Sequence, residues 1–441
     1  MIKQEATTAA IISKYDLSCR RALAVQARAS GWSSGQVSFL QRQISSHMKD
    51  LRLLARRSPT GIESNAARKQ ERILRSFAAR LCGTLYLMED RRSAVPPCPM
   101  IFEDFESFVR TSPLVGNKPD PCRMFSLSKQ NGEKRAITAP GPKTVAAQKT
   151  LVMALQVQGT ANHYEFNCQG RGCTAALIEI KRLMIDEGLR WFVVFDLAEF
   201  FTSVKPEHLE GFKLPEEVLK NVVYFNRYAT LVQHNNGKTK WIFGGQCNPA
   251  RRGIPQGAPA SGILASALLG RELRHLNGEL GIVTYVDDGV IGARTQPEAN
   301  KVAHALEKRF AKLSGGPIHF KHISVCDAVR GFAFLGYWVR SIEDEGEIGV
   351  RFTPSYQAKN KFKHKLLRRL RKKGPQLTWD DAMNELSEYR RNWMVQKPLW
   401  KPFELELVAF ELETESWVDD YFNGFTKKLP PASEAIKDAA N

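Results

Sequence analysis

Two apolar runs, far apart in this 441-residue chain, both end in acidic residues. Residues 191–197 read WFVVFDL, and residues 281–288 read GIVTYVDD. Runs this rich in Phe, Val and Ile are typical of buried strands, where an unpaired carboxylate is costly. Asp196, Asp287 and Asp288 would repel one another at neighbouring strand ends unless a cation neutralised them. The sequence therefore predicts two buried strands whose acidic ends share bound metal.

Clustered carboxylates suit Mg²⁺, which keeps water and substrate phosphate as its other ligands. Two such ions about 3.5–4 Å apart can activate a 3′-hydroxyl and stabilise a pyrophosphate leaving group. The alternative interpretation of Asp287-Asp288-Gly289 is a plain hairpin turn, because Asp-Gly is a frequent turn pair. That stretch alone favours neither interpretation, so the choice depends on the neighbouring motifs.

The chain carries 64 basic and 46 acidic residues, which gives a formal net charge of +18. This excess favours a polyanionic partner, most simply nucleic acid. No apolar run reaches the ~18 residues of a transmembrane helix, and the N-terminus lacks the layout of a signal peptide. None of the eight cysteines forms a C-x-x-C pair, so a structural zinc site is not expected. We expect a cytoplasmic protein with no membrane partner.

Four further stretches add motif-like residues in a fixed order along the chain. They are KQNGEKR at 129–135 followed by Ala139-Pro140, FNCQGRGC at 166–173, RGIPQGAPAS at 252–261, and FLGY at 334–337. Together with the two acidic runs, these six boxes resemble those of prokaryotic reverse transcriptases such as retron and group II intron proteins, over roughly residues 120–340. One box is weak evidence, whereas six in the correct order are strong.

The resemblance implies an α+β fold of the right-hand polymerase type, with fingers, a palm built on an antiparallel sheet, and a helical thumb. In chain order, the expected parts are a helical N-terminal extension at 1–92, a linker at 93–100, fingers at 101–190, a palm at 191–345 with a fingers insertion around 205–250, a basic helical thumb at 346–428, and a tail at 429–441.

The resemblance also assigns the catalytic metals to the two acidic runs. Asp196 and Asp287 would bind two Mg²⁺ ions directly, with Mn²⁺ as a substitute. The backbone carbonyl of Leu197 would be a further ligand. Asp288 would complete the catalytic acids and help to shape the metal site.

Phe201, five residues after Asp196, would lie under the sugar of the incoming nucleotide. Its ring would collide with a 2′-hydroxyl, and that collision would select deoxynucleotides. The alternative is that Phe200 and Phe201 are both ordinary core aromatics, although two adjacent side chains normally point to different faces.

Other nucleotide contacts would come from two loops. Gln256 would lie beside the nucleotide and the templating base, and Gly257 would permit close backbone approach. Lys129 and Arg135 flank an Asn-Gly pair, which is a hairpin signal, and their cationic heads would clamp the triphosphate. A solvated charged turn is the alternative for this hairpin.

Two later segments would hold the nucleic acid itself. Leu335, Gly336 and Tyr337 resemble the primer-grip turn. Residues 359–373, KNKFKHKLLRRLRKK, predict a basic helix with one apolar face, whose opposite face would follow duplex phosphates without reading sequence. The expected phosphate contacts are Lys359, Lys363, Arg368, Arg369, Arg371 and Lys372. A solvated charged face is the alternative.

The subfamily follows by elimination. Little chain remains after residue 375 for a maturase region or nuclease domain, the V-T-G thumb element of retron enzymes is missing, and the Q-G box differs from that of diversity-generating enzymes. The remaining resemblance is to compact, free-standing bacterial reverse transcriptases associated with defence against phage, which often copy a structured non-coding RNA.

The predicted reaction is the templated addition of deoxynucleotides to a 3′-end, with an RNA template, dNTP substrates and a complementary DNA product. Two alternatives stay open. An RNA-dependent RNA polymerase is disfavoured by the bulk of Phe201. A non-catalytic RNA-binding protein on a polymerase scaffold is disfavoured by the intact acids.

Overall fold

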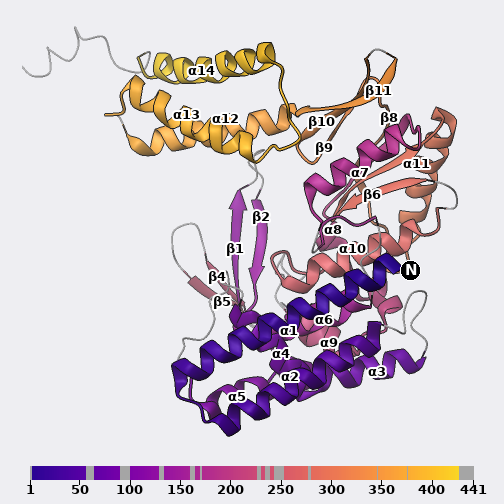
Figure 1. The fold of residues 1–441 in the computed structure, drawn as a ribbon, viewed down its shortest axis with the longest axis vertical. Coiled ribbons are helices and arrows are strands. Elements are labelled where there is room, and N and C mark those ends of the chain that lie inside the picture. The colour runs from indigo at the N-terminus through magenta and orange to yellow at the C-terminus, as the bar shows by residue number, and fades with distance from the viewer. Residues whose placement is uncertain are drawn as a thin grey trace, which may run out of the picture. The chain divides into compact units, whose positions relative to one another are not determined.

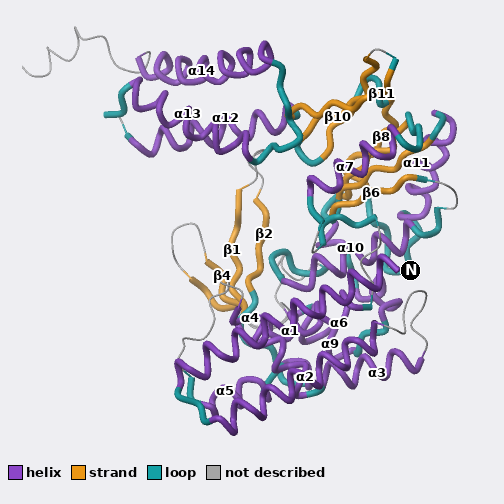
Figure 2. Tube along the Cα trace, in the orientation of Figure 1, coloured by secondary structure: helices purple, strands orange, loops and turns teal. Residues whose placement is uncertain are grey.

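The computed structural model describes twelve segments of the chain. They are residues 2–55, 64–89, 100–128, 134–158, 164–168, 171–225, 230–233, 239–242, 253–276, 280–344, 346–374 and 376–426. Helices and strands are mixed along these segments, as Figure 2 shows by colour, and the α+β class is confirmed. The chain forms two compact units: unit 1 is Met1–Gly172, Phe195–Val290 and Asn300–Ser324, and unit 2 is Cys173–Val194, Ile291–Ala299 and Val325–Asn441.

The N-terminal part of unit 1 is helical (Figure 1). Its helices are α1 (Ile2–Ser30), α2 (Ser34–Ala55), α3 (Ser64–Arg75), α4 (Phe77–Glu89), α5 (Phe102–Arg110) and α6 (Pro142–Val157). In α2, buried Leu40, Ile44, Met48 and Leu51 recur at helical spacing, so one face of the helix enters the core. Helix α4 contacts α1, α2 and α6, and is therefore the centre of this bundle.

A four-stranded sheet in the order β2-β1-β4-β5 belongs to unit 1. Its strands are β1 (Cys122–Ser128), β2 (Lys134–Ala139), β4 (Thr230–Gln233) and β5 (Thr239–Ile242). Strands β1 and β2 pair antiparallel, with Leu127 opposite Arg135, which is the hairpin that the Asn-Gly pair predicts. The loop between them, which contains Lys129, lies outside the described residues.

A second four-stranded sheet carries both acidic runs, in the order β6-β7-β3-β8. Its strands are β3 (Trp191–Leu197), β6 (Gly281–Tyr285), β7 (Asp288–Ala293) and β8 (Phe320–Asp327). Strands β7 and β3 are neighbours in this sheet. Asp196, near the end of β3, therefore lies on the strand next to the one that follows the acidic turn. The interiors of both strands are almost wholly buried, as their apolar composition predicts.

Other helical elements come before or between these strands in the sequence. They are η1 (Pro113–Val115), α7 (Cys173–Ile185), α8 (Phe200–Ser203), η2 (Pro206–Phe212), α9 (Glu216–Val218), η3 (Leu219–Val223), α10 (Pro259–Leu273) and α11 (Gln296–Phe310). Helix α10 begins at Pro259, a residue suited to the first turn because it lacks an amide proton. Gly262 therefore lies inside the helix and does not mark its start.

The C-terminal part of unit 2 joins a three-stranded sheet to three helices. The elements are β9 (Phe332–Phe334), β10 (Tyr337–Asp344), β11 (Glu347–Pro354), α12 (Tyr356–Lys373), α13 (Trp379–Val395) and α14 (Glu404–Thr426). The helices pack side by side around aromatic rings (Figure 1). Phe362 stacks on Tyr389 at 4.9 Å between centroids and lies 5.1 Å from Trp393. These rings form a core for the basic helix α12.

None of the helices in the described segments combines the length and the apolar character that crossing a bilayer requires. The cysteines among them are free thiols: Cys19, Cys82, Cys122, Cys168, Cys173 and Cys326. The expected linker at 93–100, apart from Met100, and the expected tail at 429–441 lie outside these segments.

Gly83 allows α4 to approach α6 closely. A Cβ at this position would overlap the Thr150 hydroxyl and lie 2.5 Å from the Ala146 carbonyl oxygen. Gly83→Ala therefore forces the helices apart, and we expect the free energy of unfolding to fall by about 1–3 kcal/mol in urea denaturation. The matched control is Gly35→Ala, because Gly35 is exposed and a Cβ there would meet only the Ser33 hydroxyl, at 4.0 Å. Equal stability of the two variants would contradict this packing.

Candidate active site

A backbone hydrogen bond brings the two acidic runs together. Asp196 is the penultimate residue of β3, and Asp287 lies in the turn between β6 and β7. The amide of Leu197 donates to the carbonyl oxygen of Asp287 over 3.1 Å. Both aspartates are half-buried. Their backbone is therefore fixed by the sheet, while their side chains remain partly accessible to solvent. Residues far apart in the sequence thus meet at one point of unit 1.

The electrostatics of Asp287 show that the carboxylates interact. Burial is the main cause that raises the pKa of Asp287, and repulsion from the Asp196 carboxylate raises it further. Arg135 on β2 and Lys321 on β8 act in the opposite direction. Two carboxylates that repel each other in a partly buried site favour a bound cation. Its positive charge offsets both the repulsion and the cost of burying the negative charges.

Lys321 is a site residue that no motif marks. Its ammonium group forms an ion pair with the Asp196 carboxylate, and its side chain is 70% exposed while that of Asp196 is 25% exposed. The hydrogen bond to Asp196 raises the pKa of Lys321, and the charges of Asp288 and Asp287 add to the rise. Lys321 therefore stays cationic and neutralises part of the acidic site. The pairing follows from β8 lying next to β3 in the sheet, which local sequence does not reveal.

The chemistry of the acids fits Mg²⁺, although no closed cage is preformed. Within the described segments, no three His, Cys, Asp or Glu side chains form a group that could hold a metal ion. Mg²⁺ is usually held by one or two carboxylates and completes its shell with water and substrate phosphates. Asp196 and Asp287 would supply that pair of carboxylates, which stays a prediction. Ligation by the Leu197 carbonyl and by Asp288 stays a prediction.

Strained backbone occurs in or directly beside three of the boxes. Val286 in the acidic turn has φ 63°, Glu199 after the first acid has φ 46°, and Leu335 in the F-L-G turn has φ 46°. Left-handed backbone costs a residue with a Cβ of order 1–3 kcal/mol and persists only where the surroundings enforce it. In the described segments, Lys213 is the other non-glycine residue with positive φ. The strain therefore concentrates where the sequence predicts the site.

Phe201 lies against the loop of the Q-G box. The amide of Ile254 donates to the Phe201 carbonyl oxygen over 2.9 Å. Gly253, with φ 57°, packs so tightly that a Cβ would lie 2.6 Å from the Thr202 carbonyl carbon. Phe200 is fully buried, whereas Phe201 is half-buried, so the two rings have different surroundings as predicted. The role of Phe201 toward a sugar stays a prediction.

The Q-G loop also joins the β1–β2 hairpin. The amide of Thr138 on β2 donates to the Gln256 carbonyl oxygen over 2.9 Å, and a Cβ on Gly257 would lie 3.3 Å from the Thr138 carbonyl oxygen. The side-chain oxygen Oε1 of Gln256 is buried and accepts no hydrogen bond in the described structure. A buried acceptor left unpaired costs about 1–3 kcal/mol, so this atom suits a donor from a bound ligand. Exposed Arg135 lies three residues before Thr138, on the same strand.

The F-L-G segment of unit 2 forms a tight turn between β9 and β10. Leu335 and Gly336 both have positive φ, 46° and 80°, which defines the turn type that matches strand twist in hairpins. The ammonium of Lys397 donates to the Gly336 carbonyl oxygen over 3.2 Å and lies 4.5 Å from the Tyr337 ring centre. Burial lowers the pKa of Lys397. Leu335, Gly336 and Tyr337 are thus held in one fixed turn.

The basic side chains of helix α12 that the sequence assigns to phosphate contacts fall into two groups. Lys359 pairs with Glu413 at 2.7 Å, and Arg369 pairs with Glu385 at 2.9 Å. The Lys363 ammonium lies 5.3 Å from the centre of the Trp417 ring. These three predicted phosphate contacts are therefore engaged with α13 and α14. By contrast, the remaining three are exposed on the helix surface: Arg368, Arg371 and Lys372.

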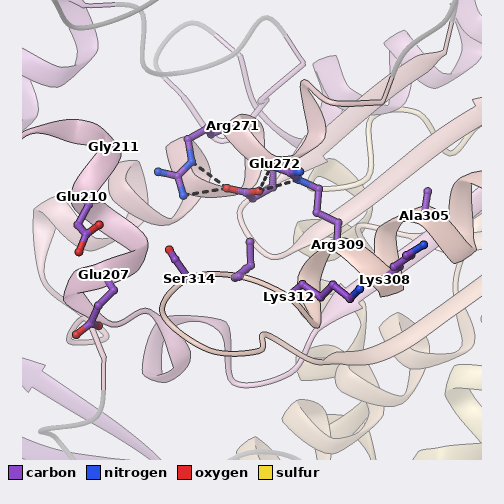
Figure 3. A pocket seen from close by; sticks show the side chains of 11 residues that line it. Glu207, Glu210, Gly211, Arg271, Glu272, Ala305, Lys308, Arg309, Lys312 and Ser314 are labelled. Atoms are coloured by element: carbon purple, nitrogen blue, oxygen red, sulfur yellow. Dashed lines mark hydrogen bonds and ion pairs between the residues drawn. The ribbon is translucent and has the colours of Figure 1, made fainter.

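A pocket elsewhere in unit 1 contains a closed ion-pair group (Figure 3). Glu272, which is 3% exposed, pairs with Arg271 at 2.9 Å and with Arg309 at 2.7 Å. One carboxylate thus bridges both guanidinium groups and offsets one of their two positive charges. The lining contains none of the predicted site residues, so this pocket is separate from the acidic site.

Residues 127–339 match the family model described as reverse transcriptase (RNA-dependent DNA polymerase). This part of the chain is therefore similar to a reverse transcriptase domain. The match includes both acidic strands, the Q-G loop and the F-L-G turn. It confirms the prediction of an α+β right-hand polymerase fold and of the enzyme class, a nucleotidyltransferase.

Two solved structures similar to the chain are telomerases. One, from Candida albicans in complex with a TWJ fragment of telomeric RNA, has 10% identity and a TM-score of 0.37, and the alignment covers 73% of this chain and 62% of that chain. The other, an apo telomerase from Candida tropicalis truncated from its C-terminal domain, has 13% identity and a TM-score of 0.37, with 50% and 53% covered. This chain spans less than two thirds of either one. A comparison with curated proteins found no match.

Gly289 follows the acids because the Phe195 ring occupies the space of a side chain. A Cβ at this position would overlap that ring. Gly289→Ala therefore shifts β7 against β3. We expect unfolding free energy to fall by about 1–3 kcal/mol, and DNA synthesis by folded protein to fall about tenfold or more, since small displacements of catalytic groups are costly.

Denaturation and primer-extension assays measure these two effects. The control is Gly262→Ala on α10, where a Cβ would meet nothing within 4 Å, so both quantities should stay near wild type. A Gly289→Ala protein that matches the control in both assays would rule out the tight β3–β7 packing.

Proposed function

We propose that this protein is an RNA-directed DNA polymerase that adds deoxynucleotides to a 3′-end. The observation that carries the proposal is the 3.1 Å backbone hydrogen bond joining Leu197 to Asp287 within the residues that match the reverse transcriptase family model. It holds two aspartates from separate strands at one site, where burial and mutual repulsion raise the pKa of Asp287. That arrangement suits divalent cations, which this chemistry requires.

Asp196 and Asp287 would hold the cations, two Mg²⁺ or Mn²⁺ ions, with the Leu197 carbonyl and Asp288 as further candidate ligands. The ions would supply activation of the 3′-hydroxyl and stabilisation of the pyrophosphate leaving group. The chain's own residues position the substrate. Arg135 and Lys129 would offset the charge of the triphosphate.

The Q-G loop and Phe201 would orient the incoming nucleotide. Gln256 Oε1, which is buried and unpaired in the described structure, would accept a hydrogen bond from the nucleotide or the templating base. Gly257 has φ 95°, a backbone conformation suited to glycine, and its missing side chain lets the loop pack closely on Ile137 and Thr138 of β2. The half-buried Phe201 would exclude a ribose 2′-hydroxyl, and so select dNTPs.

The nucleic acid would be an RNA template with its growing complementary DNA. The net charge of +18 and the exposed cations Arg368, Arg371 and Lys372 of α12 support a phosphate partner. The turn Leu335–Tyr337 would hold the primer end. By elimination among subfamilies, we propose a structured non-coding RNA as template and a role in bacterial defence against phage. Sequencing of nucleic acid that copurifies with the protein tests this part.

Asp287→Asn tests the catalytic assignment. We expect RNA binding to stay unchanged and DNA synthesis on a primed RNA to fall by about a thousandfold or more, because the neutral amide is a poor metal ligand. Primer extension with dNTPs and Mg²⁺ or Mn²⁺ measures the loss. Asp16→Asn is the control, since Asp16 forms an ion pair with Arg20 on α1, outside the predicted site. A wild-type protein that binds RNA but makes no product would favour the non-catalytic alternative.

Phe201→Ala tests the proposed sugar selection. Removing the ring opens the space for a 2′-hydroxyl, so we expect the ratio of kcat/KM for dNTPs to that for rNTPs to fall by about tenfold or more. Single-nucleotide incorporation with each sugar measures this ratio. If wild type prefers ribonucleotides, the RNA-dependent RNA polymerase alternative replaces the proposal.

A further inference from the structure

Glu165 is a buried acid beside the acidic turn that no predicted role includes. It belongs to the short segment 164–168, which lies along β6. The Thr284 amide donates to the Tyr164 carbonyl oxygen over 2.7 Å, and the Phe166 amide donates to the Thr284 carbonyl oxygen over 2.9 Å. The side chain of Glu165 is within the core, since the residue is only 1% exposed.

The Glu165 carboxylate collects donors from three parts of unit 1. Its Oε1 accepts from the amides of Asn167, at 2.6 Å, and Val286, at 3.4 Å. Its Oε2 accepts from the Thr284 hydroxyl at 3.1 Å. The Ser266 hydroxyl on α10 is a further partner. The carboxylate thus links α10, β6 and the turn that contains Asp287.

The hydrogen bond from the Val286 amide connects Glu165 to the acidic turn. Its φ of 63° is unfavourable for a β-branched residue, so its surroundings must enforce the conformation. Its amide precedes Asp287 by one residue, and the Asp287 carbonyl oxygen accepts the hydrogen bond from Leu197. Whatever fixes the Val286 amide therefore fixes the backbone that presents Asp287 to Asp196.

We propose that Glu165 is a positioning residue that holds the Val286–Asp287 turn in its strained conformation, and so sets the place of Asp287 for catalysis. A purely packing role does not explain a carboxylate here, because burying one is costly and an apolar residue would fill the space more cheaply. Anchoring of segment 164–168 does not explain it either, since two backbone hydrogen bonds already join that segment to β6. Beyond its contacts with Asn167 and Thr284, the carboxylate adds hydrogen bonds to the acidic turn at Val286 and to α10 at Ser266.

Two substitutions of similar length separate positioning from packing. In Glu165→Gln, the amide oxygen can accept from both backbone amides, and the NH₂ group can donate to the hydroxyls of Thr284 and Ser266, which also accept. Glu165→Met fills the space but accepts nothing, so the Val286 amide loses its partner. The matched control is Glu272→Met, which places the same residue at another buried carboxylate, whose partners are Arg271 and Arg309 and not the acidic turn.

The kinetic part of the test rests on the proposed polymerase activity. For folded Glu165→Met we expect kcat to fall about ten- to a hundredfold with KM within about twofold, because a displaced acid affects the chemical step. For Glu165→Gln we expect kcat within about threefold of wild type. Folded Glu272→Met keeps the wild-type kcat, although its melting temperature falls because two guanidinium groups lose their partner.

A second readout does not need activity: amide hydrogen exchange in a peptide spanning residues 283–290. We expect exchange there to be faster in Glu165→Met and unchanged in Glu165→Gln and Glu272→Met. Unchanged exchange in Glu165→Met, or equal kcat and exchange in the Gln and Met variants at position 165, overturns the inference. If wild type makes no DNA while exchange follows the expected order, the proposed function fails and the positioning role stands.

Discussion

The functional site depends on one backbone hydrogen bond, from the Leu197 amide to the Asp287 carbonyl oxygen. Two aspartates from separate parts of the chain are held together there, where burial, and after it the repulsion from Asp196, raises the pKa of Asp287. Such an arrangement is unfavourable by itself and is retained only if the surrounding fold enforces it. Lys321, paired with Asp196, offsets part of the repulsion without closing the site, since its side chain is largely exposed.

Close backbone approach is the means by which unit 1 enforces this geometry. Gly289 makes room for the Phe195 ring under the acids, and Gly253 makes room for the backbone after Phe201. The Q-G loop is tied to the β1–β2 hairpin through Thr138. Each contact joins two of the boxes or residues next to them, so the boxes are one structural assembly.

Sequence reasoning could predict the residues whose local pattern is itself unusual. An acid at the end of an apolar strand, an Asn-Gly pair between strands, and adjacent Phe residues after Asp196 all carry local signals. Lys321 and Glu165 carry none, because their partners are defined by strand neighbours that meet only in the folded sheet. The same limit applies to the cations of α12. Their helical spacing predicts which face is basic, but it does not reveal that α14 engages Lys359 and Lys363.

The central claim is that Asp196 and Asp287 hold the same divalent cation site. Replacing Mg²⁺ with Fe²⁺ and adding ascorbate and peroxide generates radicals that cleave the backbone beside the bound ion. We predict two cuts, one near residue 196 and one near residues 287–288, both lost in Asp196→Asn and both suppressed by excess Mg²⁺. Cleavage at only one of these segments, or at neither, would contradict it.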